Sequence, residues 1–216
     1  MKIKWFGHSC FLITSAHGVR ILTDPFDDTV GYEVPQIAAD IVSTSHQHFD
    51  HNNTEIVEGK FFLVNKTGTF SNKNIKMKGI AAFHDEHNGR ERGRNIIYNF
   101  IVDGIRVCHC GDLGHMLTHE QAAEIGPVDV LLLPVGGVAT IGAEQAKQVA
   151  GLLKPELIIP MHFQTEVLTF PLEQVERFIG KMGKSKCIYT GKQEIELQPG
   201  KFSASSPKVM VLAYGS

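Results

Sequence analysis

Short apolar runs separated by turn-forming residues fill the first third of the chain, and this pattern predicts β-strands. His17-Gly18 favours a hairpin turn, and Pro25 ends a strand because proline cannot donate to a β-ladder. The segment 66–78 is polar, rich in Lys and Asn, and predicts turns. The strands predicted in this part of the chain are 2–6, 10–14, 19–24, 40–44 and 61–64.

Strands and helices alternate in the second half. The apolar run 129–133 predicts a strand buried on both faces. Thr118 with Gln121 three residues later predicts a capped helix over 118–125, and Pro171 predicts the start of another helix. The chain is therefore expected to be an α/β protein with one domain over 1–216. The other predicted helices are 52–58, 143–153 and 171–182, and the other strands are 79–83, 95–102, 105–110, 157–160, 187–189, 194–197 and 209–212.

Composition narrows the class of protein. The chain has 216 residues, 43% of them hydrophobic, and a formal net charge of −2, which excludes a disordered protein and gives no basis for non-specific nucleic-acid binding. No apolar stretch approaches the roughly 18 residues of a membrane-spanning helix, and the first residues lack the pattern of a signal peptide. Four cysteines make no disulfide framework in a chain of this length. We predict a cytoplasmic protein with reduced thiols.

Histidine carries the strongest chemical signal, with 11 residues. His46, His48, Asp50 and His51 place four metal-ligand side chains within six residues, directly after a predicted strand. Imidazole suits zinc, iron, manganese or nickel. A solvated polar loop is the alternative, but a cluster of this density repels itself once it is protonated. The cluster therefore favours a metal site.

Three further candidates, His84, Asp112 and His162, each follow a predicted apolar strand. Ligands gather outside the carboxyl ends of strands in open α/β sheets. Any one of these side chains alone is more typical of structural hydrogen bonding. Their shared placement predicts that they converge on the histidine cluster.

The chain resembles the metallo-β-lactamase superfamily of metallohydrolases. The HxHxDH motif stands at 46–51, and later family positions are matched by Ala82-Phe83-His84, Gly111-Asp112 and Pro160-Met161-His162-Phe163. A small branch related to ascorbate-6-phosphate lactonase is indicated by three further segments: Phe6-Gly7-His8-Ser9, Thr23-Asp24-Pro25 and Pro134-Val135-Gly136-Gly137.

The resemblance implies a four-layer αββα sandwich with two divalent metal ions, zinc first and manganese, iron or nickel as alternatives. One ion would be held by His46, His48 and His84, and the other by Asp50, His51 and His162. Asp112 would bridge the two ions. A metal-bridging hydroxide would then attack the substrate, with Asp50 and His162 taking part in catalysis.

Residues of a second rank surround these ligands. His8, Asp24 and His109 are candidates for orienting the ligands or touching substrate, with ordinary turn hydrogen bonding as the alternative. The charged loop 85–94 is predicted to be a mobile flap. Its three arginines could hold an anionic substrate, although a solvated loop explains them as well. The roles of His87 and His115 stay open, and Cys108 and Cys110 are expected to be core thiols.

Departures from other branches of the superfamily favour a small hydrolase. His48 stands where oxygen-reducing diiron relatives carry Glu, and Asp112 stands where one subclass of zinc β-lactamases carries Cys. We predict hydrolysis of a small lactone, amide or phosphoester, with no membrane partner and no nucleic-acid partner. The alternatives are a metal-dependent nuclease or phosphodiesterase and a non-catalytic metal-binding or ligand-binding protein. A homo-oligomer is not excluded.

Overall fold

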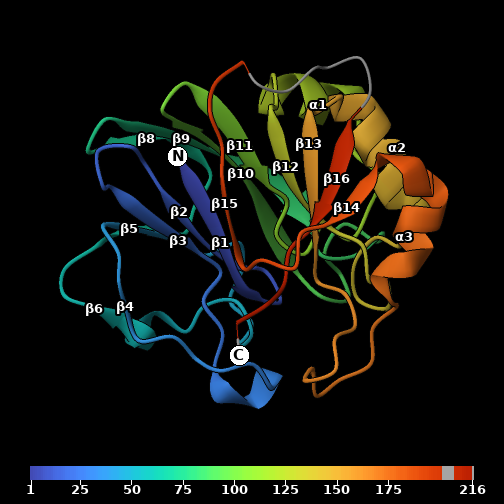
Figure 1. The fold of residues 1–216 in the computed structure, drawn as a ribbon, viewed down its shortest axis with the longest axis horizontal. Helices are drawn as coiled ribbons and strands as arrows, with labels where there is room; N and C mark the ends of the chain where they lie inside the picture. Colours follow the sequence, from blue (N-terminus) through green and yellow to red (C-terminus); the bar gives the residue numbers. More distant parts are fainter. Residues whose placement is uncertain (201–206, 216) are drawn as a thin grey trace.

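Two β-sheets face each other in the computed structural model, which describes residues 1–200 and 207–215 (Figure 1). The first has the strand order β15-β1-β2-β3-β5-β7, and the second has the order β14-β16-β13-β12-β11-β10-β9-β8. The first sheet contains β1 (Lys2–Gly7), β2 (Cys10–Thr14), β3 (Arg20–Thr23), β5 (Ile41–Ser43), β7 (Phe62–Val64) and β15 (Glu194–Glu196). The second contains β8 (Gly68–Asn72), β9 (Ile75–Phe83), β10 (Arg94–Val102), β11 (Ile105–His109), β12 (Val130–Pro134), β13 (Leu157–Met161), β14 (Cys187–Tyr189) and β16 (Lys208–Val211).

Strand alternation divides the apolar side chains of the first sheet between two cores. Ile21 and Ile41 belong to the large core that the two sheets share. Their neighbours Leu22 and Val42 belong to a smaller core on the other face. Successive side chains of a strand point to opposite faces, so both faces of this sheet are covered.

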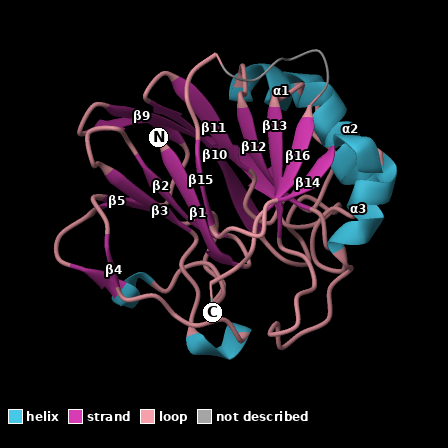
Figure 2. Ribbon diagram, viewed as in Figure 1, coloured by secondary structure: helices cyan, strands magenta, loops and turns pink. Residues whose placement is uncertain are grey.

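Three α-helices cover the second sheet: α1 (His119–Ile125), α2 (Ala143–Leu153) and α3 (Val175–Met182) (Figure 2). Helix α1 contacts β9 and β10, and α2 contacts β12 and α3. The mixed architecture confirms the predicted α/β class. The layer over the first sheet differs from the expected αββα sandwich, because loops build it. These loops carry two 3-10 turns (Asp28–Val30 and Thr54–Ile56) and the small sheet of β4 (Ile37–Ala38) and β6 (Val57–Glu58).

The N-terminal strand pairs with a late segment of the chain in the first sheet. Strand β1 pairs with β2 on one side and with β15 on the other. The Met1 amino group donates to the Leu197 carbonyl at 2.9 Å, and the Leu197 N–H donates to the Met1 carbonyl, also at 2.9 Å. The chain therefore leaves the second sheet after β14 and completes the first sheet before it returns as β16.

The two sheets are joined near the ends of their strands. The Tyr98 hydroxyl, buried on β10, lies 3.1 Å from the Thr44 carbonyl and 3.0 Å from the Val64 carbonyl. The Ile96 N–H donates to the Ser45 carbonyl at 2.9 Å. These bonds fix the loop after β5 against the second sheet, so that chain segments from both sheets reach one edge of the sandwich.

Three local predictions are wrong. Segment 66–78 forms β8 and the start of β9, whose polar side chains alternate with buried Ile75 and Met77. Segment 52–58 forms a 3-10 turn and β6 rather than a helix. Helix α3 begins at Val175 and not at Pro171, because the Glu173 N–H donates to the Gly136 carbonyl and ties the preceding residues to a loop. The capping box of Thr118 and Gln121 is present as predicted.

Candidate metal centre

The seven predicted ligands converge at one edge of the sandwich. His46, His48, Asp50 and His51 occupy the loop after β5, in the first sheet. The other three follow strands of the second sheet: His84 follows β9, Asp112 lies beyond β11, and His162 follows β13. The strand ends of two sheets thus supply a single cluster, which is the arrangement that the sequence pattern predicts.

A first group consists of His46, His48 and His84, each with a ring nitrogen within 4.8 Å of the others. The His46 Nε2 and His48 Nδ1 atoms lie 3.0 Å apart. Two nitrogen ligands of one tetrahedral zinc, each about 2.0–2.1 Å from the ion, lie about 3.3 Å apart. The spacing of this pair is therefore close to that of ligands that share a cation.

A second group contains Asp50, His51 and His162, and the structure adds His8 to it. The His8 Nε2 lies 3.2 Å from Asp50 Oδ2. His8 is a second-rank candidate in the sequence, and its positive φ of 49° at the β1–β2 turn places its ring inside the cluster. It lies where it can orient Asp50.

Asp112 lies between the two groups. Its Oδ1 is 3.2 Å from His51 Nε2, and its Oδ2 is 3.2 Å from His84 Nε2 and 3.1 Å from His162 Nε2. One carboxylate therefore has an oxygen toward a histidine of each group. This placement fits the bridging role that the family resemblance implies.

Asp24 fixes the orientation of two ligand rings. Its Oδ2 accepts hydrogen bonds from His51 Nδ1 at 2.8 Å and from the Ser45 hydroxyl at 2.5 Å, and its Oδ1 accepts from the Ser45 N–H at 2.7 Å. The Ser45 oxygen lies 2.9 Å from His46 Nδ1. Because these contacts occupy both Nδ1 atoms, the Nε2 atoms of His46 and His51 stay available for a metal.

Two orienting residues carry no sequence signal strong enough to single them out. Ser45 precedes the motif and links Asp24 to His46. Asn95, at the start of β10, accepts from the Asp112 N–H at 3.0 Å and donates to the Cys110 carbonyl at 2.8 Å. Each acts through hydrogen bonds that join distant parts of the chain, so a local pattern cannot reveal them.

The protonation states of His46, His48 and Asp112 suit metal binding. His51 differs: although burial opposes its charge, Asp112 and Asp24 raise the pKa of His51 well above its usual range. Burial lowers the pKa of His46 to about 3, and the charge of His51 acts in the same direction. Burial also lowers the pKa of His48. Although burial opposes its ionisation, His162 and His51 hold the pKa of Asp112 well below its usual range. Neutral imidazoles and an ionised carboxylate are the forms that bind metal ions.

Buried atoms without partners supply the test of whether a cation fits. His51 Nε2 and Asp112 Oδ1 lie 3.2 Å apart, yet among the described residues neither has a hydrogen-bond partner, and the buried Asp50 Oδ1 has none there either. Unpaired buried polar atoms are costly and call for an explanation. A divalent ion among these nitrogen and carboxylate atoms would satisfy them, so the residues fit the expected metal.

The remaining histidine candidates lie outside the cluster. His109 is fully buried, its Nδ1 accepts from the Gly111 N–H at 3.1 Å, and its Nε2 lies 2.9 Å from the Ser9 carbonyl. His115 contacts the Phe83 N–H and the Met116 carbonyl through its two nitrogens. His87 is exposed and lies 3.4 Å from Glu91. Both nitrogens of His109 and of His115 are occupied, which makes these two residues structural.

The loop 85–94 is held by Asp85, in contrast to the mobile flap that its composition predicts. The buried Asp85 carboxylate accepts hydrogen bonds from the backbone N–H groups of His87, Gly89, Glu91 and Arg92 at 2.8–3.1 Å. Although desolvation opposes its ionisation, these bonds lower the pKa of Asp85. The loop is thereby anchored next to the candidate ligand His84.

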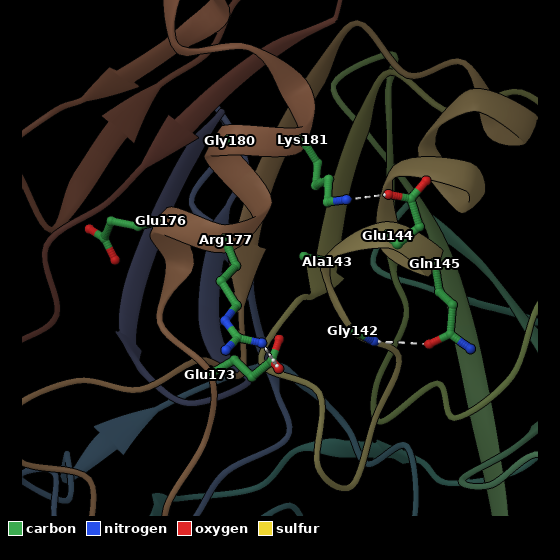
Figure 3. Close-up of a pocket in the computed structure, with 9 residues that line it drawn as sticks. All are labelled: Gly142, Ala143, Glu144, Gln145, Glu173, Glu176, Arg177, Gly180 and Lys181. Carbon is green, nitrogen blue, oxygen red and sulfur yellow. Dashed lines mark hydrogen bonds and ion pairs between the residues drawn. The ribbon is translucent and has the colours of Figure 1, made fainter.

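A groove between α2 and α3 is a second concave surface, with a volume of about 750 Å³ (Figure 3). Its cations are neutralised locally, because Lys181 pairs with Glu144 at 2.8 Å and Arg177 pairs with Glu173. The groove lies on the helical layer and contains none of the candidate ligands. The candidate chemistry is therefore confined to the cluster at the sandwich edge.

Comparisons with known proteins agree with this geometry. The family model described as "Beta-lactamase superfamily domain" matches residues 2–162. A UPF0173 metal-dependent hydrolase of Archaeoglobus fulgidus is 31% identical over 80% of this chain and 85% of its own length. A relative of the same description from Thermoplasma acidophilum is 29% identical, over 91% of this chain and 99% of its own length.

A solved structure extends the comparison to almost the whole chain. It is a Thermotoga maritima protein assigned to the Zn-dependent hydrolases of the metallo-β-lactamase superfamily. It is 42% identical, covers 98% of this chain and 97% of its own, and superposes with a TM-score of 0.80. No helix in the described part of the chain is long and apolar enough to cross a membrane. From its fold, its histidine and aspartate cluster and these matches, the chain belongs to the β-lactamase superfamily and, within it, to the UPF0173 family of metal-dependent hydrolases.

Proposed function

We propose that the protein hydrolyses a small molecule with the help of two divalent metal ions, of which zinc is the first choice. The observation that carries this proposal is the position of Asp112, whose Oδ2 faces a histidine of each group and whose Oδ1 faces His51 of the second group. A bridging carboxylate between two three-residue groups is the arrangement expected of a dinuclear site. Lactones, amides and phosphoesters are the substrate classes that such a site can attack.

Each residue has a defined task in this proposal. His46, His48 and His84 would hold one ion, Asp50, His51 and His162 the other, and Asp112 both. When bound, two such ions supply Lewis acidity and lower the pKa of a shared water so that it becomes a nucleophile near neutral pH. Asp24 and Ser45 keep the ligand rings oriented. Asp50, whose Oδ2 lies 3.2 Å from His8 Nε2, would be both a ligand and the carboxylate that orients the nucleophile.

The substrate is proposed to be a small molecule rather than a nucleic acid. Nucleic-acid binding depends on many cationic contacts to phosphates, and the chain carries 21 basic against 23 acidic residues. A cytoplasmic location also belongs to the proposal.

Metal content tests the proposal first. Protein purified without an affinity tag or a chelator should contain about two transition metal ions per chain by elemental analysis. About one ion per chain would overturn the dinuclear assignment. If no metal is found and added zinc, manganese or iron is not retained, the whole mechanism fails.

Activity tests it next, with a matched pair of histidine variants. The metal-loaded protein should hydrolyse at least one of a panel of carboxylic esters, lactones, amides and phosphodiesters. Chelation should abolish this activity and zinc should restore it. His48→Ala should remove it, whereas His87→Ala, an exposed histidine outside the cluster, should retain it. Equal activity in the two variants would contradict the ligand assignment.

A further inference from the structure

A cavity of about 800 Å³ opens beside the candidate ligands His46 and His48. Its walls come from the loop after β5, the segment 65–67 after β7, the end of β9 and the start of β10. Sites for small molecules in proteins span roughly 300–1,000 Å³. The cavity therefore has the size and the position of a substrate pocket next to the metal centre.

The charge of this cavity is all of one sign. Three of its lining residues, Lys66, Arg92 and Arg94, are cationic, and none of its lining residues is acidic. Arg92 has a carboxylate within 4.0 Å, that of Glu91 at 3.8 Å. In the part of the chain that the structure describes, Lys66 and Arg94 form no ion pair within that distance. In a chain with net charge −2, three clustered cations, of which only Arg92 has a carboxylate partner among the described residues, mark a place for an anion.

The backbone that carries the two arginines is held in place. The Arg92 N–H donates to Asp85 Oδ2 at 2.8 Å, and Arg94 pairs with Phe83 in the ladder of β9 and β10. The carbonyl of Gly93, between them, accepts from the His84 N–H at 3.0 Å. The arginine pair is thereby connected through the backbone to a candidate ligand. A binding site with a backbone fixed in advance loses less conformational entropy when it binds.

We propose that this cavity is the subsite for an oxyanion, a phosphate or a carboxylate, that the substrate carries away from the bond to be cleaved. Guanidinium groups bind both kinds of oxyanion through paired, charge-assisted hydrogen bonds. Phe83 and Ile96 add apolar wall for the body of the substrate. That the bound anion belongs to a substrate rests on the proposed hydrolase function. That the cavity binds an anion does not.

The anion site is tested first without metal and without turnover. Inorganic phosphate and acetate are titrated calorimetrically into dialysed, metal-free protein at pH 8. Arg94→Ala and Lys66→Ala should each weaken binding about tenfold, since one charge-assisted contact is worth at least a factor of that size. Arg90→Ala is the matched control, because Arg90 lies in the same loop but does not line the cavity.

Each outcome of the titration decides something. Phosphate binding that exceeds acetate binding assigns a phosphorylated substrate, and the reverse assigns a carboxylated one. The proposal is overturned if neither anion binds, or if Arg90→Ala weakens binding as much as Arg94→Ala does. The small-molecule assignment would be overturned if a single-stranded oligonucleotide binds more tightly than either anion and its affinity falls with salt concentration as steeply as expected for contacts to several phosphates.

Kinetics with metal-loaded protein then separate the two proposals. Ester and lactone pairs that differ only in a distal phosphate or carboxylate should show a lower KM for the anionic member. Lys66→Ala and Arg94→Ala should raise that KM about tenfold and should raise the KM of the neutral member less, whereas Arg90→Ala should change neither KM. If neutral and anionic members are hydrolysed with equal KM, the subsite proposal fails and the hydrolase proposal stands. If no substrate is hydrolysed but phosphate binding depends on Lys66 and Arg94, the hydrolase proposal fails and the anion site stands.

Discussion

Asp24→Asn is the substitution that tests most directly how the fold prepares the ligand histidines. Asp24 is fully buried and serves three donors: the Ser45 N–H, the Ser45 hydroxyl and His51 Nδ1. Asparagine has nearly the same shape but carries no charge, and one of its two terminal atoms donates rather than accepts. The variant thus changes the electrostatics of the site while it keeps the packing.

The expected loss of stability follows from those three bonds. The amide oxygen of the introduced asparagine would keep the bonds to the Ser45 hydroxyl and His51, which turns its NH₂ group toward the Ser45 N–H. A buried donor left without an acceptor costs about 1–3 kcal/mol. The two retained bonds lose their charge assistance, about 1 kcal/mol each. Removal of a buried charge offsets part of this sum, since burial alone would raise the pKa of Asp24. We expect a net loss of about 3 kcal/mol.

The loss of metal affinity is estimated separately. Partners that orient a ligand histidine contribute about 10–100-fold to metal affinity, which is about 1.4–2.7 kcal/mol. Competition with a chromophoric zinc chelator measures affinity, and urea unfolding of the metal-free protein measures stability. Asp27→Asn is the control, because Asp27 lies three residues away in sequence and its carboxylate accepts from the Thr29 N–H as the cap of a 3-10 turn.

The result that would refute this reasoning is specific. If Asp24→Asn binds two zinc ions as tightly as the parent protein, the orientation of His51 does not depend on the Asp24 charge. If Asp27→Asn loses affinity to the same extent, the effect of Asp24 comes from a general loosening of the loop.

Four further substitutions have defined outcomes. Asp112→Ala should lose metal at both sites, with the secondary structure retained by circular dichroism; two ions bound with parental affinity would exclude the bridging role. Gly114→Ala should lower stability by about 1–3 kcal/mol in urea unfolding and weaken metal binding, because a Cβ there would lie 2.2 Å from the backbone of the candidate ligand His84. Gly151→Ala in α2 is its control, since a Cβ there meets open space. This variant should be neutral or stabilising by up to about 1 kcal/mol in the same assay. Although burial of Asp129 opposes its ionisation, Arg106 lowers the pKa of this carboxyl. The pair therefore stabilises the fold above the ordinary Asp pKa and loses that contribution in acid. Asp129→Asn should cost about 1 kcal/mol at pH 7, a value reduced by solvent screening, and its difference from the parent protein in urea unfolding should shrink below pH 4.

The regular elements could be predicted where side-chain burial produces a clear pattern. The run that forms β12 is buried at all five positions, and the paired signals of Thr118 and Gln121 mark a helix start that the structure contains. Strand β8 is an edge strand whose side chains are mostly exposed, so its residues need not be apolar and its sequence resembles a turn. The start of α3 is set by hydrogen bonds to a distant loop, which a local capping signal cannot reveal.

In the candidate site, too, a role that follows from a sequence pattern could be predicted, and a role that depends on distant contacts could not. The convergence of His84, Asp112 and His162 on the motif could be predicted because strand ends meet at a sheet edge. The roles of His109 and His115 cannot be assigned from the sequence, since they depend on which backbone groups occupy their ring nitrogens. The sequence does not reveal the Asp85 anchor for a similar reason. Its four bonds depend on the path of the loop, and the charged, glycine-bearing composition of that loop is also typical of flexible segments.

The pairing of β1 with β15 has a consequence for synthesis in the cell. Met1 and Leu197 are separated by 196 positions, and a ribosome that adds about 5–20 residues per second needs about 10–40 s to cover that distance. Until then one edge of β1 offers open backbone groups, which are a template for pairing with other chains. Lys2, which contacts Glu194 at 3.3 Å in the finished protein, places a charge on this edge. That charge therefore protects the open edge of the nascent sheet until β15 emerges and closes it.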